Sequence, residues 1–309
     1  MNKKNRHLKK GLALGIILLL VLGGTIPSTG RESENSCKLT SYNSFSEDKG
    51  TEYWALIFAV GKYKDHPKEN RPGMIKAAEN LYEVLLTSPQ SQWKADHIHI
   101  VTGENATGKR LIQEFIWLIR SEDSDDMSLI YLTTHGSPLK GPNGNPLDLP
   151  PRDENDGADE MLLMYEGFVK WYAFIWDDLI NFFLNLLQSK GVCLIVESCY
   201  AGGFNDEPKF RGQKVYDYTI ESYTQGLSEE LSSQNRVVLM SSSENELSYG
   251  SIFSEYLIYG FWGWADLIGN RDGTNSAEEA FYYAKNFVYH EQHPTMLDLY
   301  PGEFPVTYS

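Results

Sequence analysis

The chain has little cysteine: only Cys37, Cys193 and Cys199 occur among its 309 residues. Domains that are held together by disulfides use many more, so this sequence is not a disulfide scaffold. Cys193 and Cys199 are six residues apart in one predicted strand. That separation is about 20 Å at ~3.3 Å per residue, beyond the reach of a disulfide. We therefore expect Cys199 to carry a free thiol and Cys193 to be an inert buried one.

Clusters of positive charge are also missing outside the first few residues. The formal net charge is -15, and the first 30 residues hold five basic residues and no acid, so the rest of the chain carries -20. Binding to phosphate backbones needs basic clusters, so we expect no nucleic acid partner. An acidic surface of this kind mainly keeps a protein soluble.

No apolar run reaches the ~20 residues that a membrane-spanning helix needs. The nearest is residues 11–24, which follow a basic segment and precede small and polar residues. This layout predicts that residues 1–30 are a secretory signal or a membrane anchor through residues 11–26. We therefore expect an exported protein, either secreted or held on the extracytoplasmic side of a membrane. Residues 31–50 are polar and are predicted to be a linker to one domain at 51–309.

Within that domain, short buried strands alternate with amphipathic helices. Strands are predicted at 54–60, 97–101, 127–134, 161–165, 191–199 and 236–241, and helices at 72–86, 107–119, 176–188, 223–231, 251–265 and 277–289. Alternation of this kind gives an α/β fold whose parallel strands are joined by right-handed crossovers.

Two of these strands end in residues that can perform chemistry. Residues 127–134 lead into His135-Gly136-Ser137, and residues 191–198 lead into Cys199 and the small residues that follow it. The carboxyl ends of parallel strands are where open α/β sheets place their sites. A Cys and a His at the ends of two buried parallel strands can face each other across the top of the sheet, as a nucleophile with its base.

These two motifs carry a resemblance to a known family. Thr-Thr-His-Gly-Ser and Glu-Ser-Cys-Tyr-Ala-Gly-Gly, whose His135 and Cys199 are 64 residues apart, resemble the His-Gly and Glu-x-Cys boxes of the caspase-like cysteine peptidases of clan CD, the legumain-like family above all. The resemblance runs from Tyr53 to Pro305. It implies a three-layer α/β/α sandwich around a mostly parallel sheet of about six strands.

The resemblance also implies an activity, that of a cysteine endopeptidase acting on a peptide or protein substrate. Cys199 would form a thioester acyl-enzyme with His135 as base, and the backbone N–H groups of Gly136 and Cys199 would hold the oxyanion. Two alternatives stay open at this point. The acyl-enzyme of a transpeptidase or transamidase of the same family is resolved by an amine, and a catalytically inactive binding module would use the scaffold alone.

The legumain-like family lines its specificity pocket with a basic residue, the acid of the Glu-x-Cys box and a later serine. The matching positions here are Arg71, Glu197 and Ser248. An Arg–Glu pair offers both donors and acceptors, as the side chain of a P1 asparagine requires. If Arg71 points elsewhere, Glu197 alone favours a basic P1 residue. Asn70 is assigned no catalytic role.

No cofactor is expected, and calcium is the one metal that the sequence admits. Two acidic runs have the oxygen ligands that calcium prefers. The first resembles the acidic loop of metacaspases and the second resembles part of an EF-hand loop, with Ile268 where the first ligand is required. The residues concerned are Asp153, Asp156, Asp159 and Glu160 in the first run, and Asn270, Asp272 and Glu279 in the second.

Overall fold

The computed structural model describes residues 50–140, 143–145, 147, 160–168, 173–200, 235–242, 248 and 251–309. Of residues 199 and 200 it describes the backbone. Thr51–Ser309 is one compact unit with its own core. In the described part of the chain no helix is both long and apolar enough to cross a bilayer. The predicted anchor at 11–26 lies outside that part.

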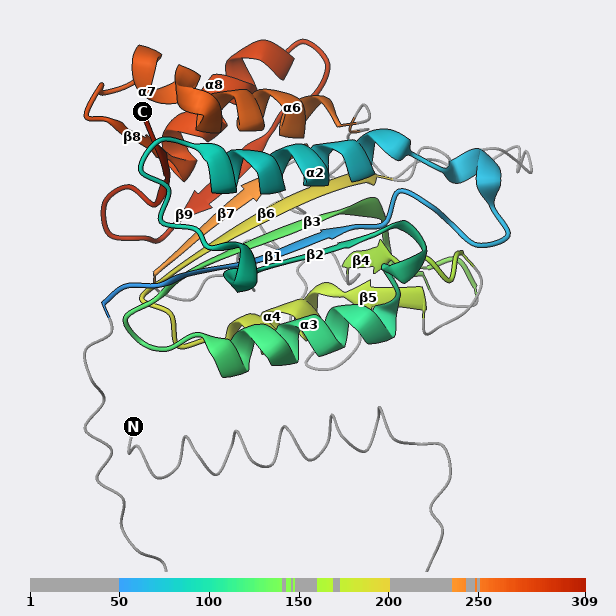
Figure 1. Cartoon of the computed structure of the whole chain (residues 1–309). Helices are drawn as coiled ribbons and strands as arrows, with labels where there is room; N and C mark the ends of the chain where they lie inside the picture. The colour runs from blue at the N-terminus through green and yellow to red at the C-terminus, as the bar shows by residue number, and fades with distance from the viewer. Residues whose placement is uncertain are drawn as a thin grey trace, which may run out of the picture. The chain divides into compact units, whose positions relative to one another are not determined.

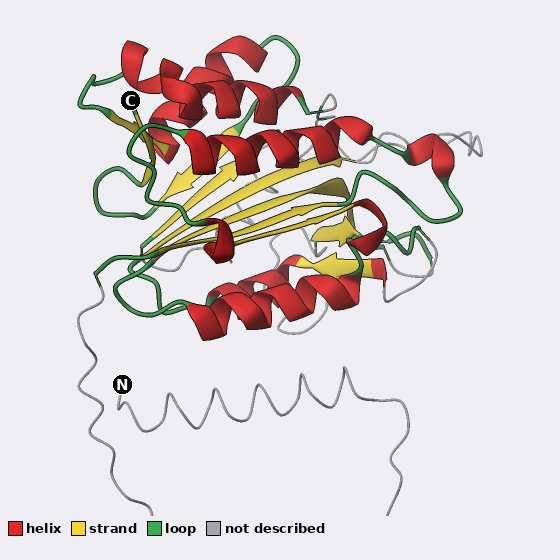
Figure 2. Ribbon diagram, viewed as in Figure 1, coloured by secondary structure: helices red, strands yellow, loops and turns green. Residues whose placement is uncertain are grey.

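A mostly parallel sheet runs through the middle of the unit (Figures 1 and 2). Its strands are β1 (Tyr53–Ala59), β2 (Ile98–Thr102), β3 (Met127–Pro138), β6 (Gly191–Tyr200), β7 (Arg236–Met240) and β9 (Thr295–Asp298), in the order β2-β1-β3-β6-β7-β9. The first five in that order are parallel, and β9 is antiparallel to β7. The predicted sheet is confirmed, with β9 as an unpredicted antiparallel edge.

Two small additions extend this sheet. β4 (Glu160–Leu163) pairs antiparallel with the last residues of β3, and β5 (Phe174–Trp176) pairs with β4. A separate ladder joins β8 (Thr274–Ser276) to β10 (Pro305–Tyr308). The β4 pairing matters for function because it lies beside the end of β3 that carries the His-Gly motif.

Helices cover both faces, which gives the predicted three layers (Figure 1). One face carries α2 (Pro72–Thr87), α6 (Ile252–Tyr259), α7 (Ala265–Ile268) and α8 (Ala277–Val288), and the other carries α3 (Gly108–Ser121) and α4 (Asp177–Leu184). Short 3-10 turns lie at η1 (Pro67–Glu69), η2 (Ala95–His97) and η3 (Gly103–Asn105). Thr107 caps α3 by accepting a hydrogen bond from the Arg110 N–H, as its position before the apolar stripe predicts.

The helix that we expected at 251–265 is interrupted. A single π-helical turn at Gly260–Trp264 separates α6 from α7, and Gly263 has a φ of 110°, a conformation that favours glycine. Gly260 packs so closely on α8 that a Cβ there would lie 2.9 Å from the Ala280 backbone. The interruption between α6 and α7 therefore begins at Gly260, where the absence of a side chain lets the helix pack closely against α8.

Burial in the core fixes the positions of β3 and β6, the two strands that end in the motifs. Both strands are buried on both faces, as near-continuous apolar runs in a parallel sheet predict. Tyr131, Cys193 and Ile195 share the core cluster under α6 and α8. Cys193 is buried and free, and burial raises the pKa of its thiol well above the ordinary value. This thiol is therefore inert, as expected.

Candidate functional site

The two motifs meet at the carboxyl ends of β3 and β6. These strands pair in parallel from Met127 with Gly191 onwards, and in this register His135 lies opposite Cys199 and Gly136 opposite Tyr200. β1, the other neighbour of β3, already ends at Ala59, opposite Thr133. The His-Gly motif and the backbone of Cys199 therefore lie together at the carboxyl ends of β3 and β6, beyond the last residue of β1.

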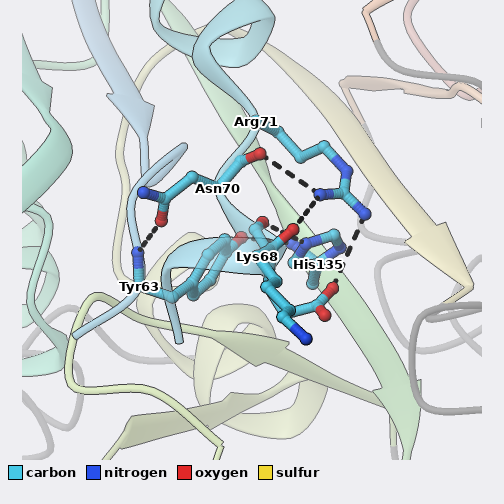
Figure 3. Close-up of polar contacts among 6 residues, drawn as sticks. Tyr63, Lys68, Asn70, Arg71 and His135 are labelled. Carbon is cyan, nitrogen blue, oxygen red and sulfur yellow. Dashed lines mark hydrogen bonds and ion pairs between the residues drawn. The ribbon is translucent and has the colours of Figure 1, made fainter. Parts of the chain in front are cut away.

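The imidazole of His135 is held by a backbone carbonyl. Its Nε2 lies 3.0 Å from the carbonyl oxygen of Glu69, and the side chain is only 3% exposed (Figure 3). Because a carbonyl oxygen can only accept, Nε2 carries the hydrogen in the neutral ring and Nδ1 is the basic nitrogen. Among the residues that the structure describes, Nδ1 has no hydrogen-bond partner. The ring therefore has one basic nitrogen that is buried and is not used by the described residues.

The electrostatic surroundings keep this base neutral. Burial lowers the pKa of His135 below its ordinary value of 6.5, the hydrogen bond to Glu69 raises it, and the charge of Arg71 lowers it again. The net direction is downward. A neutral imidazole near pH 7 can take a proton, as a general base must.

The loop after β1 brings the Glu69 carbonyl to this ring. The Arg71 N–H donates to the Gly61 carbonyl at 2.9 Å. Figure 3 shows the second contact, in which the side-chain oxygen of Asn70 accepts from the Tyr63 N–H at 2.9 Å. Gly61 has a φ of +57°, and a Cβ there would lie 2.7 Å from the Ile75 side chain. These contacts close residues 61–71 into a compact turn. They give Asn70 a structural role.

Arg71 lies beside the imidazole and remains accessible. Its Nη1 donates to the carbonyls of Lys68 and Asn70, both at 3.2 Å, and its Nη2 lies 3.5 Å from the Glu69 carboxylate (Figure 3). The side chain is 38% exposed. Arg71 thus places a solvent-accessible positive charge beside the His135 imidazole.

Glu197 lies on the same strand as Cys199 but in the core. Its carboxylate is 0% exposed and accepts hydrogen bonds from the Tyr131 hydroxyl at 3.2 Å, the Ser254 N–H at 3.2 Å and the Ser254 hydroxyl. Burial raises its pKa from 4.5 to about 7. The side chain therefore joins β6 to the first turn of α6, and its contact with substrate stays a prediction.

The remaining predicted site residues are placed but untested. Gly136 lies between Leu162 of β4 and Tyr200 of β6, so its backbone is at the right strand end for an oxyanion donor. Ser248 is buried, and the residues on either side of it lie outside the described part of the chain. The roles of both residues stay predictions.

The calcium predictions fall partly outside the described residues. Those at 153, 156 and 159 lie there, and Glu160 is the buried first residue of β4. In the second run Asn270 donates to Asp272 at 3.3 Å and, through its backbone, to Glu279 at 2.8 Å. No group of three His, Cys, Asp or Glu side chains in the described ranges is arranged to hold a metal ion. Calcium binding stays a prediction.

Two features of the site carry no sequence signal. The Glu69 carbonyl is a backbone atom, so no residue type marks it. The Tyr63 hydroxyl, which accepts from the His135 N–H at 2.9 Å, comes from the loop after β1, where no motif marks it. A tyrosine shortly after the first strand was the one available hint.

Comparison with known proteins shows the fold. No protein-family model matches the chain, and no curated protein matches it. Among solved structures it is similar to the protein GSU0716 from Geobacter sulfurreducens, with a TM-score of 0.54, 14% identity, and coverage of 83% of this chain and 99% of that one. It is also similar to caspase-1 from Spodoptera frugiperda, with a TM-score of 0.50, 13% identity, and coverage of 84% and 90%. The fold of this chain is caspase-like.

Proposed function

We propose that the chain is a cysteine endopeptidase that uses Cys199 as nucleophile and His135 as its base. One observation carries the proposal: His135 lies directly opposite Cys199 in the paired strands, with its Nε2 tied to the Glu69 carbonyl and its Nδ1 buried without a hydrogen-bond partner among the described residues. Residues opposite each other in parallel strands lie on one face of the sheet. Positions 135 and 199 therefore share one face of the sheet.

The reaction follows from this arrangement. His135 Nδ1 takes the proton of the Cys199 thiol, and the thiolate attacks the peptide carbonyl to give a tetrahedral oxyanion. The N–H groups of Gly136 and Cys199 would donate to that oxyanion. The imidazolium then returns the proton to the leaving amine, which leaves a thioester. Water, deprotonated by His135, attacks the thioester and releases the acid and the thiol.

The accessible charge at the site also favours one kind of substrate. Arg71 lies beside His135, whereas the carboxyl of Glu197 is buried and its pKa is raised to about 7. The Glu69 carboxylate is 3.5 Å from Arg71, and the two side chains are 21% and 38% exposed, so this ion pair is long and only partly buried and leaves Arg71 able to bind another acceptor. We therefore propose a P1 residue with acceptor oxygens, Asp or Asn, in preference to a basic one.

The test is a comparison of the full chain with three variants on a peptide library that scans P1. Cys199→Ala and His135→Ala should each lower kcat/KM by more than ~10³-fold, because the two residues act as one unit. Cys193→Ala, which removes the buried thiol in the same strand, is the matched control and should retain activity. Added amine nucleophile separates hydrolysis from transfer. Activity that survives Cys199→Ala but not Cys193→Ala would show that the nucleophile is misassigned.

A further inference from the structure

The backbone of β3 loses its strand partner just before His135. The Val60 N–H donates to the Thr133 carbonyl at 3.0 Å, the last step of the ladder between β1 and β3. In a continuing parallel ladder the next donor, the His135 N–H, would bond to the Val60 carbonyl. That carbonyl instead accepts from Lys62 at 2.6 Å, because the chain turns away. The His135 N–H is buried and needs another acceptor.

The hydroxyl of Tyr63 supplies it. The His135 N–H donates to this oxygen at 2.9 Å, and the same hydroxyl lies 3.0 Å from Thr134 Oγ1. Thr134 gives its own proton to the Leu163 carbonyl, which can only accept, so the Tyr63 hydroxyl donates to Thr134. The direction of donation is thus defined from the His135 N–H of β3 to the Tyr63 hydroxyl, and from there through Thr134 to Leu163, the last residue of β4. The Tyr63 hydroxyl thus takes the place of the Val60 carbonyl as the acceptor for the His135 N–H.

Tyr63 is connected to the His135 side chain in two further ways, one direct and one through the loop after β1. Its ring centroid lies 4.8 Å from that of His135, with an interplanar angle of 31°. Its backbone N–H is tied to the Asn70 side chain, in the loop whose Glu69 carbonyl accepts from Nε2. Tyr63 therefore restrains the backbone of His135, one side of its ring and the loop that orients its proton.

We propose that Tyr63 is a positioning residue that holds His135 in the orientation and tautomer that a general base needs. This inference rests on the proposed role of His135. Tyr63→Phe keeps the ring and removes the hydroxyl, which leaves the buried His135 N–H without an acceptor. Small misplacements of a catalytic group cost up to ~10²-fold. We expect kcat to fall ~10–100-fold with KM changed less than ~2-fold.

The experiment measures kcat, KM and the ¹⁵N shifts of both His135 ring nitrogens in the full chain. Tyr63→Phe should shift the tautomer populations of His135 as well as kcat, which a loss of stability alone would not do. Tyr259→Phe is the matched control, because it removes a hydroxyl from a 43% exposed tyrosine whose partner is Glu255. Asn70→Ala, which frees the loop from the Tyr63 backbone, should also lower kcat, but by a smaller factor than Tyr63→Phe.

The outcomes separate this inference from the proposed function. A wild type that hydrolyses no peptide overturns the proposed function, while the ring shifts still test Tyr63. An active wild type with unchanged kcat and tautomer in Tyr63→Phe overturns the positioning role, as does a change in KM alone. If Tyr63→Phe does not fold, unchanged kcat and ring shifts in folded Asn70→Ala overturn it instead.

Discussion

Replacing Glu197 by glutamine should change how stability depends on pH. The carboxyl is fully buried and accepts hydrogen bonds from Tyr131 and Ser254, and burial raises its pKa from 4.5 to about 7. As the pH rises, the unfolded chain therefore releases this proton before the folded chain does. The favourable contribution of the group is complete below pH 4.5 and is lost as the pH rises to about 7.

The size of this effect follows from the shift itself. One pKa unit corresponds to ~1.4 kcal/mol, so the wild type should lose about 3 kcal/mol of unfolding free energy to this group between low pH and pH 8. Glutamine resembles the protonated carboxyl and does not titrate. Between pH 5.5 and pH 8, the stability of Glu197→Gln should rise relative to wild type by about 2 kcal/mol.

Urea unfolding at several pH values between 5.5 and 8 measures this difference. The pKa of Glu278 is also raised to about 7 by burial, but Glu278 is present in both proteins and cancels. Glu255→Gln makes the same chemical change on the exposed side of α6 and is the matched control. If the difference in unfolding free energy between Glu197→Gln and wild type does not change with pH, the raised pKa of the Glu197 carboxyl is refuted.

Two further predictions concern the site itself. In Cys199→Ala, the ring resonances of His135 should titrate below pH 6.5, because burial lowers the pKa of this imidazole; an NMR titration that gives a higher value contradicts the description of its surroundings. Arg71→Glu should lower kcat/KM for peptides with P1 Asp by ~10-fold or more and favour basic P1 residues. Lys68→Glu reverses a charge on the exposed part of the same loop and should leave the P1 profile unchanged.

The location of the two motifs at one edge of the sheet was predictable because it depends on the pattern of apolar runs along the chain. Apolar runs of the right length predict parallel strands, and parallel strands end on one edge of the sheet. That rule brings His135 and Cys199 to the same edge of the sheet. The strand order, which puts β3 beside β6, and the register, which puts His135 opposite Cys199, come from the structure.

The hydrogen bonds around His135 were not predictable in the same way. The Glu69 carbonyl and the Tyr63 hydroxyl reach the imidazole because the chain after β1 turns sharply at Gly61 and closes on Asn70. A turn of this kind depends on a few local torsion angles, which periodicity does not encode. Backbone acceptors also leave no residue type that a motif could record.

The case of Glu197 shows why residue type alone misjudges the charge of a site. A glutamate two residues before Cys199 suggests a negative pocket wall, and hence a basic P1 residue. Its burial and its pKa of about 7 weaken that charge, whereas Arg71 keeps its guanidinium at the accessible edge beside His135. An ionised group in water attracts substrate, while a buried one that keeps its proton supports the fold. The substrate preference of this site should therefore follow the exposure of its charges, which favours acceptor oxygens at P1.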